Sequence, residues 1–187
     1  MAVSKKTSAS KATPKKAVAK KVATPKNVKS TSLVIKIPQG GQVIRSFNLT
    51  PSLPVDGKAA NWLLVDPAKP TQDIDSMSFS FSVKSSSLEQ EFERAIIEIN
   101  LLQNSNDKGV WRFASDGVFT DPGFGDTSHN IAVEIINQGF TLIAQVQCVD
   151  GSESDIRFGY LASFTDAISG AVNIYESQDP DVRVGRP

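Results

Sequence analysis

The segment from Asn130 to Tyr175, NIAVEIINQGFTLIAQVQCVDGSESDIRFGYLASFTDAISGAVNIY, decides the fold class. Apolar and polar residues alternate in the runs 131–135, 140–148 and 156–164, and turn-forming residues separate these runs. Because successive side chains of a strand point to opposite faces, the pattern predicts an antiparallel meander with one buried face. In this register Leu142 and Phe158 point into the core and Leu161 points away from it. A last short strand is expected at 171–175.

The sequence before this segment also indicates short strands. They are expected at 33–37, 42–48, 61–65, 76–83, 110–113 and 118–119, the last two on either side of Ser115-Asp116-Gly117. The stretch 88–103 fits both helical and strand spacing, and we divide it into a helical turn at 88–92 and a strand at 94–103. So many short strands with regular turns predict an all-β, antiparallel β-sandwich, immunoglobulin-like or jelly-roll-like.

Charge is divided unevenly along the chain, although the formal net charge is zero. Residues 1–30 contain nine lysines and no acidic residue, and the first acidic residue is Asp56. The remaining 11 basic residues are outnumbered by 20 acidic ones, so residues 31–187 carry a charge of −9. Without aromatic side chains, residues 1–30 cannot bury enough apolar surface to offset their ordering entropy. We therefore expect a disordered Lys/Ala/Pro-rich tail (1–30) followed by a β-sandwich domain (31–187).

The basic tail is the main functional signal in the sequence. Each lysine can pair with a phosphate and release a condensed counterion, which gives salt-dependent affinity for nucleic acid or another polyanion. The tail has no arginine to read guanine edges and no aromatic residue to stack on bases, so DNA binding is expected to be non-specific. Alternatively, the tail only aids solubility or folds back onto the acidic body. The predicted contacts are Lys5, Lys6, Lys11, Lys15, Lys16, Lys20, Lys21, Lys26 and Lys29.

Residues suited to catalysis are scarce. His129 is the only histidine, so a Ser-His-acid triad would have to use it, and its surroundings do not resemble a nucleophile elbow. No phosphate-binding glycine loop appears. A plain surface histidine is the preferred interpretation, and the protein is predicted not to be an enzyme and to need no cofactor.

The carboxylates of the sequence fit either metal binding or turn formation. With one histidine and one cysteine, the usual zinc ligand sets are excluded. Acidic residues gather in expected loops, where calcium would find oxygen ligands, but Asp is also a preferred turn residue. Turn formation is the preferred interpretation, and no metal site is predicted. The clustered residues are Asp73 with Asp75, Asp121 with Asp126, and Asp150 with Glu153 and Asp155.

The sequence gives few signals of location. Cys148, the single cysteine, falls on the expected core face and is interpreted as a small buried hydrophobic residue. No apolar run approaches the length that spans a bilayer, and the first residues lack the apolar stretch of a secretory signal. We therefore expect a cytoplasmic protein with no membrane partner.

Two parts of the chain resemble known proteins. Residues 11–29, with Pro14-Lys15-Lys16-Ala17 and Thr24-Pro25-Lys26, resemble the tails of linker-histone-like proteins, which implies non-specific nucleic-acid binding. From Val110 to Pro187, the Trp111-Arg112-Phe113 stretch, the alternating strands and the closing SQDPDV (177–182) resemble bacterial inclusion-body proteins of the AidA/PixA type. They also resemble an uncharacterised group of β-sandwich proteins with an Asp-Pro ending. This resemblance implies the fold and no catalytic residues.

The function expected from the sequence is non-enzymatic binding. The tail would tether the acidic sandwich to a polyanion, while the sandwich binds a partner or forms a homo-oligomer. A structural, self-assembling protein is the alternative: a small capsid-type coat protein with a basic arm, or an inclusion-body protein.

Overall fold

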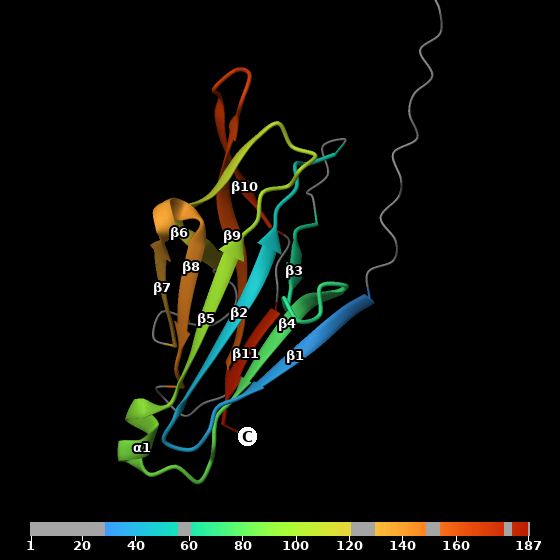
Figure 1. Ribbon diagram of the computed structural model, residues 1–187. Helices are drawn as coiled ribbons and strands as arrows, with labels where there is room; N and C mark the ends of the chain where they lie inside the picture. Colours follow the sequence, from blue (N-terminus) through green and yellow to red (C-terminus); the bar gives the residue numbers. More distant parts are fainter. Residues whose placement is uncertain (1–28, 56–60, 121–129, 149–153, 178–180, 187) are drawn as a thin grey trace, which may run out of the picture.

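The computed structural model describes residues 29–55, 61–120, 130–148, 154–177 and 181–186 (Figure 1). These ranges contain eleven strands, one short α-helix and one 3-10 turn. The elements are β1 (Lys29–Lys36), β2 (Gln42–Thr50), β3 (Leu63–Val65), β4 (Gln72–Ser80), α1 (Ser87–Phe92), β5 (Arg94–Leu101), β6 (Gly109–Thr120), β7 (Ile131–Ile136), η1 (Asn137–Gly139), β8 (Thr141–Val146), β9 (Ser154–Asp166), β10 (Val172–Glu176) and β11 (Asp181–Gly185). No helix in these ranges is both long enough and apolar enough to cross a bilayer.

The strands form one hydrogen-bonded path that folds into two packed layers. The path runs β10-β9-β11-β4-β3-β2-β5-β8-β7, and β1 and β6 join it beside β4 and β9. The path passes from one layer to the other between β3 and β4. The register between these two strands is a single pair, Val65 with Asp73. One layer is therefore β3-β2-β5-β8-β7, and the other contains β1, β4, β11, β9, β6 and β10. The predicted all-β sandwich is confirmed.

Strand direction is mixed, which amends the antiparallel expectation. The pairs β1–β4, β4–β11 and β2–β5 are parallel, and the remaining pairs are antiparallel. Alternation along a strand reports which face is buried and says nothing of a neighbour's direction. Parallel neighbours need a long connection, and here β3, β4 and α1 lie between β2 and β5 in the chain.

The predicted meander is wrong, although its strands exist. β7 pairs with β8 and β9 pairs with β10, but β8 lies between β5 and β7 in one layer while β9 lies in the other. β8 and β9 each bury one face in the same core, so their periodicity is the same in either layer. A strand that was not predicted, β11, lies between β4 and β9.

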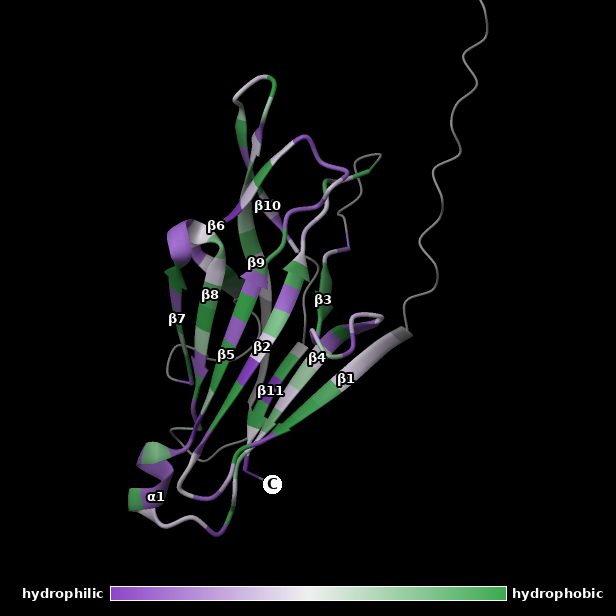
Figure 2. Ribbon diagram, in the orientation of Figure 1, coloured by the Kyte–Doolittle hydropathy of each residue, from purple (hydrophilic) through white to green (hydrophobic). Residues whose placement is uncertain are grey.

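The core lies between the two layers and takes the alternate side chains of nearly every strand. Figure 2 shows apolar and polar residues alternating along much of β2 and β5. Leu142 is buried as predicted, Leu161 is half-buried, and the side chain of Phe158 lies outside the described part. Cys148 is buried, as expected for a small apolar residue. The largest fully buried side chains include Trp111, Tyr160, Phe47, Phe81, Leu49 and Met77.

The division of segment 88–103 is confirmed by α1 and β5. Ser86 caps α1 through a capping box with Glu89, and β5 buries every second residue. The two strands expected at 110–113 and 118–119 form a single strand, β6, whose register shifts between Phe113 and Val118. Ser115 and Gly117 have positive φ in this irregular stretch, so the turn chemistry produces a bulge rather than a break.

Candidate functional site

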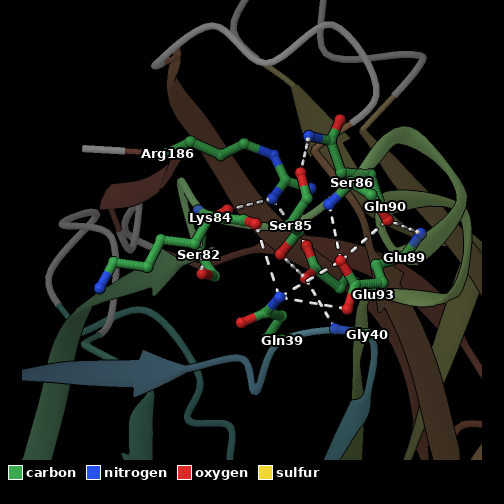
Figure 3. Close-up of polar contacts among 10 residues, drawn as sticks. All are labelled: Gln39, Gly40, Ser82, Lys84, Ser85, Ser86, Glu89, Gln90, Glu93 and Arg186. Carbon is green, nitrogen blue, oxygen red and sulfur yellow. Dashed lines mark hydrogen bonds and ion pairs between the residues drawn. The ribbon is translucent and has the colours of Figure 1, made fainter.

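A buried polar cluster gathers around Glu93, between α1 and β5 (Figure 3). Glu93 is fully buried. Its Oε1 accepts hydrogen bonds from the Gly40 N–H at 2.9 Å and from the Ser85 hydroxyl. Its Oε2 forms an ion pair with Arg186 Nη1 at 2.6 Å. The carboxylate thus connects the turn after β1, the loop after β4 and the residue that follows β11.

Arg186 joins the two layers at this end of the sandwich. Its side chain is only 6% exposed. Besides the ion pair, Nη1 donates a hydrogen bond to the Ser82 carbonyl at 2.6 Å, and the guanidinium lies 5.3 Å from the centre of the Phe81 ring. Nε and Nη2 are buried and have no hydrogen-bond partner in the structure described here, an arrangement that costs stability. The Nη1 contacts fix the end of β11 against the loop after β4.

Further hydrogen bonds, among Gln39, Glu89, Ser86 and Gln90, hold the loops around Glu93. Gln39 Nε2 lies 3.1 Å and 3.2 Å from the two carboxylate oxygens of Glu89. Glu89 in turn accepts a hydrogen bond from the Ser86 N–H at 2.7 Å, and Gln90 Nε2 donates to the Ser85 carbonyl at 3.0 Å. The capping of α1 therefore also positions the Ser85 hydroxyl toward Glu93.

The environment keeps both carboxylates of this cluster ionised. Burial raises the pKa of Glu93, but hydrogen bonds from Ser85 and Gly40 and the contact with Arg186 outweigh burial, so its pKa lies below the usual value. The pKa of Glu89 is lowered, mainly by the Ser86 N–H. A buried, ion-paired carboxylate with a lowered pKa is a poor proton donor at neutral pH. The cluster can therefore act as an ionic lock between loops and strands.

One pair of the clustered carboxylates predicted as turn residues lies in a strand instead. Asp73 and Asp75 lie within β4, so the turn interpretation is wrong for this pair. Asp73 Oδ1 accepts a hydrogen bond from the Leu64 N–H at 3.2 Å, and burial raises its pKa against the opposing effect of that bond. Ser30 donates its hydroxyl hydrogen to Asp75. These carboxylates join β4 to β3 and β1.

The other predicted site residues lie mostly beyond the described ranges. The positions outside them are Lys5, Lys6, Lys11, Lys15, Lys16, Lys20, Lys21, Lys26, Asp121, Asp126, His129, Asp150 and Glu153. Asp155 lies in β9, but its side chain is outside the description. Lys29 and Ser30 lie in β1 and pair with Gln72 and Asp73 through the backbone, so the expected disordered tail (1–30) is wrong for its last two residues. Within the described ranges, no group of His, Cys, Asp or Glu residues could hold a metal ion.

The ion pair of Glu93 and Arg186 was not predicted, although the sequence contains a signal for it. Residues 95, 97, 99 and 101 of β5 are buried, and Glu93 shares their parity. Val182 and Val184 are buried in β11, and Arg186 shares their parity. A carboxylate at a core position requires a buried cation or several donors. Such a pair of opposite charges, each at an inward position beside an apolar strand, could have indicated the contact.

The described residues define an all-β sandwich protein with an ionic lock at one end. The chain belongs to the DP-EP family, whose sequence pattern matches residues 29–186. That match begins at the first residue of β1 and leaves the lysine-rich residues 1–28 outside it. No curated protein matches the chain. The solved structures similar to it include the cysteine protease inhibitor EhICP2 from Entamoeba histolytica, with 10% identity and a TM-score of 0.26. That similarity covers 78% of this chain and 97% of the inhibitor.

Proposed function

We propose that this protein is a non-enzymatic binding protein of the cytoplasm, whose lysine-rich residues 1–30 tether an acidic β-sandwich to nucleic acid or another polyanion. The observation that carries the proposal is the segregation of charge. Nine lysines and no acid occupy residues 1–30, while residues 31–187 carry a charge of −9. Lysine ammonium groups bind phosphates mainly as point charges, so the binding is independent of base sequence.

The charged residues of the sandwich support this proposal, because they offer a polyanion no attraction. Glu93 and Arg186, the buried acid and base of the described part, neutralise each other. The remaining excess of acidic residues repels a polyanion, so the body contributes no attraction of its own. The lysine segment then makes the contact with the polyanion, and the sandwich is the domain that it tethers there.

The test compares the full chain with a variant of the same length that carries glutamine at the eight lysines before β1. Fluorescence anisotropy is measured with two duplex DNAs of unrelated sequence and with heparin, at one physiological salt concentration. We expect the full chain to bind all three, the two duplexes with affinities within about threefold, because phosphate contacts carry no sequence information. The glutamine variant should lose most of this binding. A strong preference for one duplex would contradict non-specific binding, and unchanged binding by the variant would exclude the lysines as the contact.

Capsid-type self-assembly, the structural alternative, makes a different prediction for particle size. Negative-stain microscopy of the full chain with and without DNA separates the two functions. A tethered binding protein gives small discrete particles, whereas a coat protein gives closed shells of uniform diameter.

A further inference from the structure

The strand β10 leaves one edge open in the described structure. It pairs with β9 through residues 172–176, and no described strand pairs with its other edge. Figure 1 shows the β9–β10 hairpin projecting beyond the ends of the neighbouring strands. An open edge presents a row of N–H and C=O groups that can pair with another strand.

Two backbone hydrogen bonds establish which residues of β10 face β9. The Asp166 N–H donates to the Ala171 carbonyl at 2.9 Å, and the Ser177 N–H donates to the Tyr160 carbonyl at 2.9 Å. Hydrogen-bonded and non-hydrogen-bonded pairs alternate along an antiparallel ladder. The odd-numbered positions from 171 to 177 therefore direct their backbone groups toward β9.

The even-numbered residues direct their backbone groups toward the open edge. These are Val172, Ile174 and Glu176. The side chains of Val172 and Ile174 are also exposed, at 61% and 62%, on the outer face of the sheet. The inner face is marked by Tyr175, whose ring packs against Trp111 at 5.4 Å between centroids. Two exposed branched apolar side chains thus lie at the residues whose backbone groups point to the open edge.

Three other strands at the ends of the described layers, β1, β6 and β7, carry features that protect an edge from pairing. β1 has a lysine at each end and a register shift between Thr31 and Ser32. β6 has a register shift between Phe113 and Val118. β7 has the exposed Glu134 in its middle. Lysines, bulges and charges are the devices by which proteins prevent edge-to-edge association. β10 has a regular register with β9 and no charge before Glu176.

Charge indicates which partner suits this edge. The nine residues 167–175 contain no charged side chain, in a body of charge −9. Two copies of the body repel each other, and an uncharged edge is where they can approach at the lowest electrostatic cost. A charged partner would find no complementary charge on this strand.

We propose that β10 is a self-association edge, at which two copies of the chain pair antiparallel about a two-fold axis through Ile174. This register places Ile174 opposite Ile174 of the second copy, and Val172 opposite Glu176 of the second copy. All three residues present outward backbone groups, so the pairing forms about six backbone hydrogen bonds. The two Glu176 side chains lie about 14 Å apart along the strands, which avoids like-charge contact. The proposal is independent of polyanion binding.

The dimer is reversible, because a pair of five-residue strands is a small interface. Sedimentation velocity of the full chain, over a wide concentration range without nucleic acid, should show a mass that rises from one copy toward two. In the Ile174→Lys variant the two lysines of a dimer would lie next to each other at the two-fold axis. Their repulsion should keep the protein monomeric. Val34→Lys changes a residue with similar exposure on β1 and should behave like the unaltered chain.

Cysteine cross-linking tests the register. Residue 174 lies about 5.5 Å from its equivalent between Cα atoms, which a disulfide can span. Residue 172, equally exposed, lies about 14 Å from its equivalent, which a disulfide cannot span. Ile174→Cys should therefore form covalent dimers under mild oxidation at least about tenfold faster than Val172→Cys. The unaltered chain controls for Cys148, which is buried.

Three results would overturn the proposal. The first is a single-copy mass at every concentration up to about millimolar. The second is equal cross-linking of Ile174→Cys and Val172→Cys, which would mean a different register or random collision. The third is an assembly larger than two copies that Ile174→Lys leaves unchanged, which would place the contact elsewhere on the molecule.

Discussion

Glu93 and Arg186 form a buried ion pair of 2.6 Å that joins the residue before β5 to the residue after β11. Removing one partner leaves the other charge buried and unpaired, which costs about 3–5 kcal/mol. We therefore expect Arg186→Met to lower the free energy of unfolding by about that amount in urea denaturation. Adding Glu93→Gln should recover part of the loss, because the remaining side chain is then neutral.

The exposed Arg45, in β2, serves as the control for this ion pair. Arg45→Met should change the free energy of unfolding by no more than about 0.5 kcal/mol, as for most surface substitutions. Equal losses for Arg45→Met and Arg186→Met would show that stability depends on the overall charge of the protein and not on the buried pair.

The lowered pKa of Glu93 predicts a loss of stability in acid. Because its pKa is lower in the folded state than the ordinary value of 4.5, the ionised form is favoured by folding. The contribution is complete above about pH 4.5 and is lost as the pH falls through the lowered folded value. Stability curves of the unaltered chain and of Glu93→Gln should thus converge as the pH falls below about 4.5. If the difference in unfolding free energy between the two proteins widens on acidification, folding raises the pKa of Glu93 instead of lowering it.

The inward register of β8 is tested with two neighbouring residues of similar size. Leu142 is fully buried, whereas Ile143 is half-buried on the other face. Leu142→Ala should cost about 2–5 kcal/mol through the lost transfer energy and the cavity, and Ile143→Ala should cost clearly less. Chemical denaturation of both variants measures the difference. Equal costs would mean that both faces of β8 are buried.

Gly117 is required in the bulge of β6 for two reasons. Its φ is +78°, and a Cβ atom there would lie 2.8 Å from Leu142 Cδ1. Gly170 has a similar φ of +70°, with nothing within 4 Å of such a Cβ. Gly170→Ala should therefore cost about 1 kcal/mol of backbone strain, and Gly117→Ala about 1–3 kcal/mol more through overpacking. Thermal unfolding of the two variants measures this difference, and equal costs would show that the core accommodates the methyl group.

Much of the fold could be predicted because a strand that buries one face has alternating apolar and polar residues in its own sequence. The alternation in β4, β5 and β8 appears in the sequence, and so does the capping chemistry before α1. The layer assignment could not be predicted in this way. β8 and β9 bury the same kind of face toward the same core, so their sequences do not distinguish neighbours from opposing strands.

The candidate site was harder to predict, because it depends on contacts between distant segments. Glu93, Ser85 and Arg186 meet only after the loops and β11 are in place. The frequency of Asp in turns favours a turn for Asp73 and Asp75, whereas the hydrogen bonds to Leu64 and Ser30 that hold them in β4 are non-local. The lysine segment could be recognised from composition alone.

The salt dependence of DNA binding tests polyanion tethering most directly. Each lysine–phosphate contact contributes about −0.9 to the slope of log K against log salt, so nine lysines give a slope as steep as about −8. The measurement is a fluorescence-anisotropy salt series on duplex DNA, with the full chain and with the variant carrying glutamine at the eight lysines before β1. We predict a steep slope for the full chain, and for the variant weak binding with a slope no steeper than about −1. A variant that binds as tightly as the full chain, with the same slope, would contradict the tether.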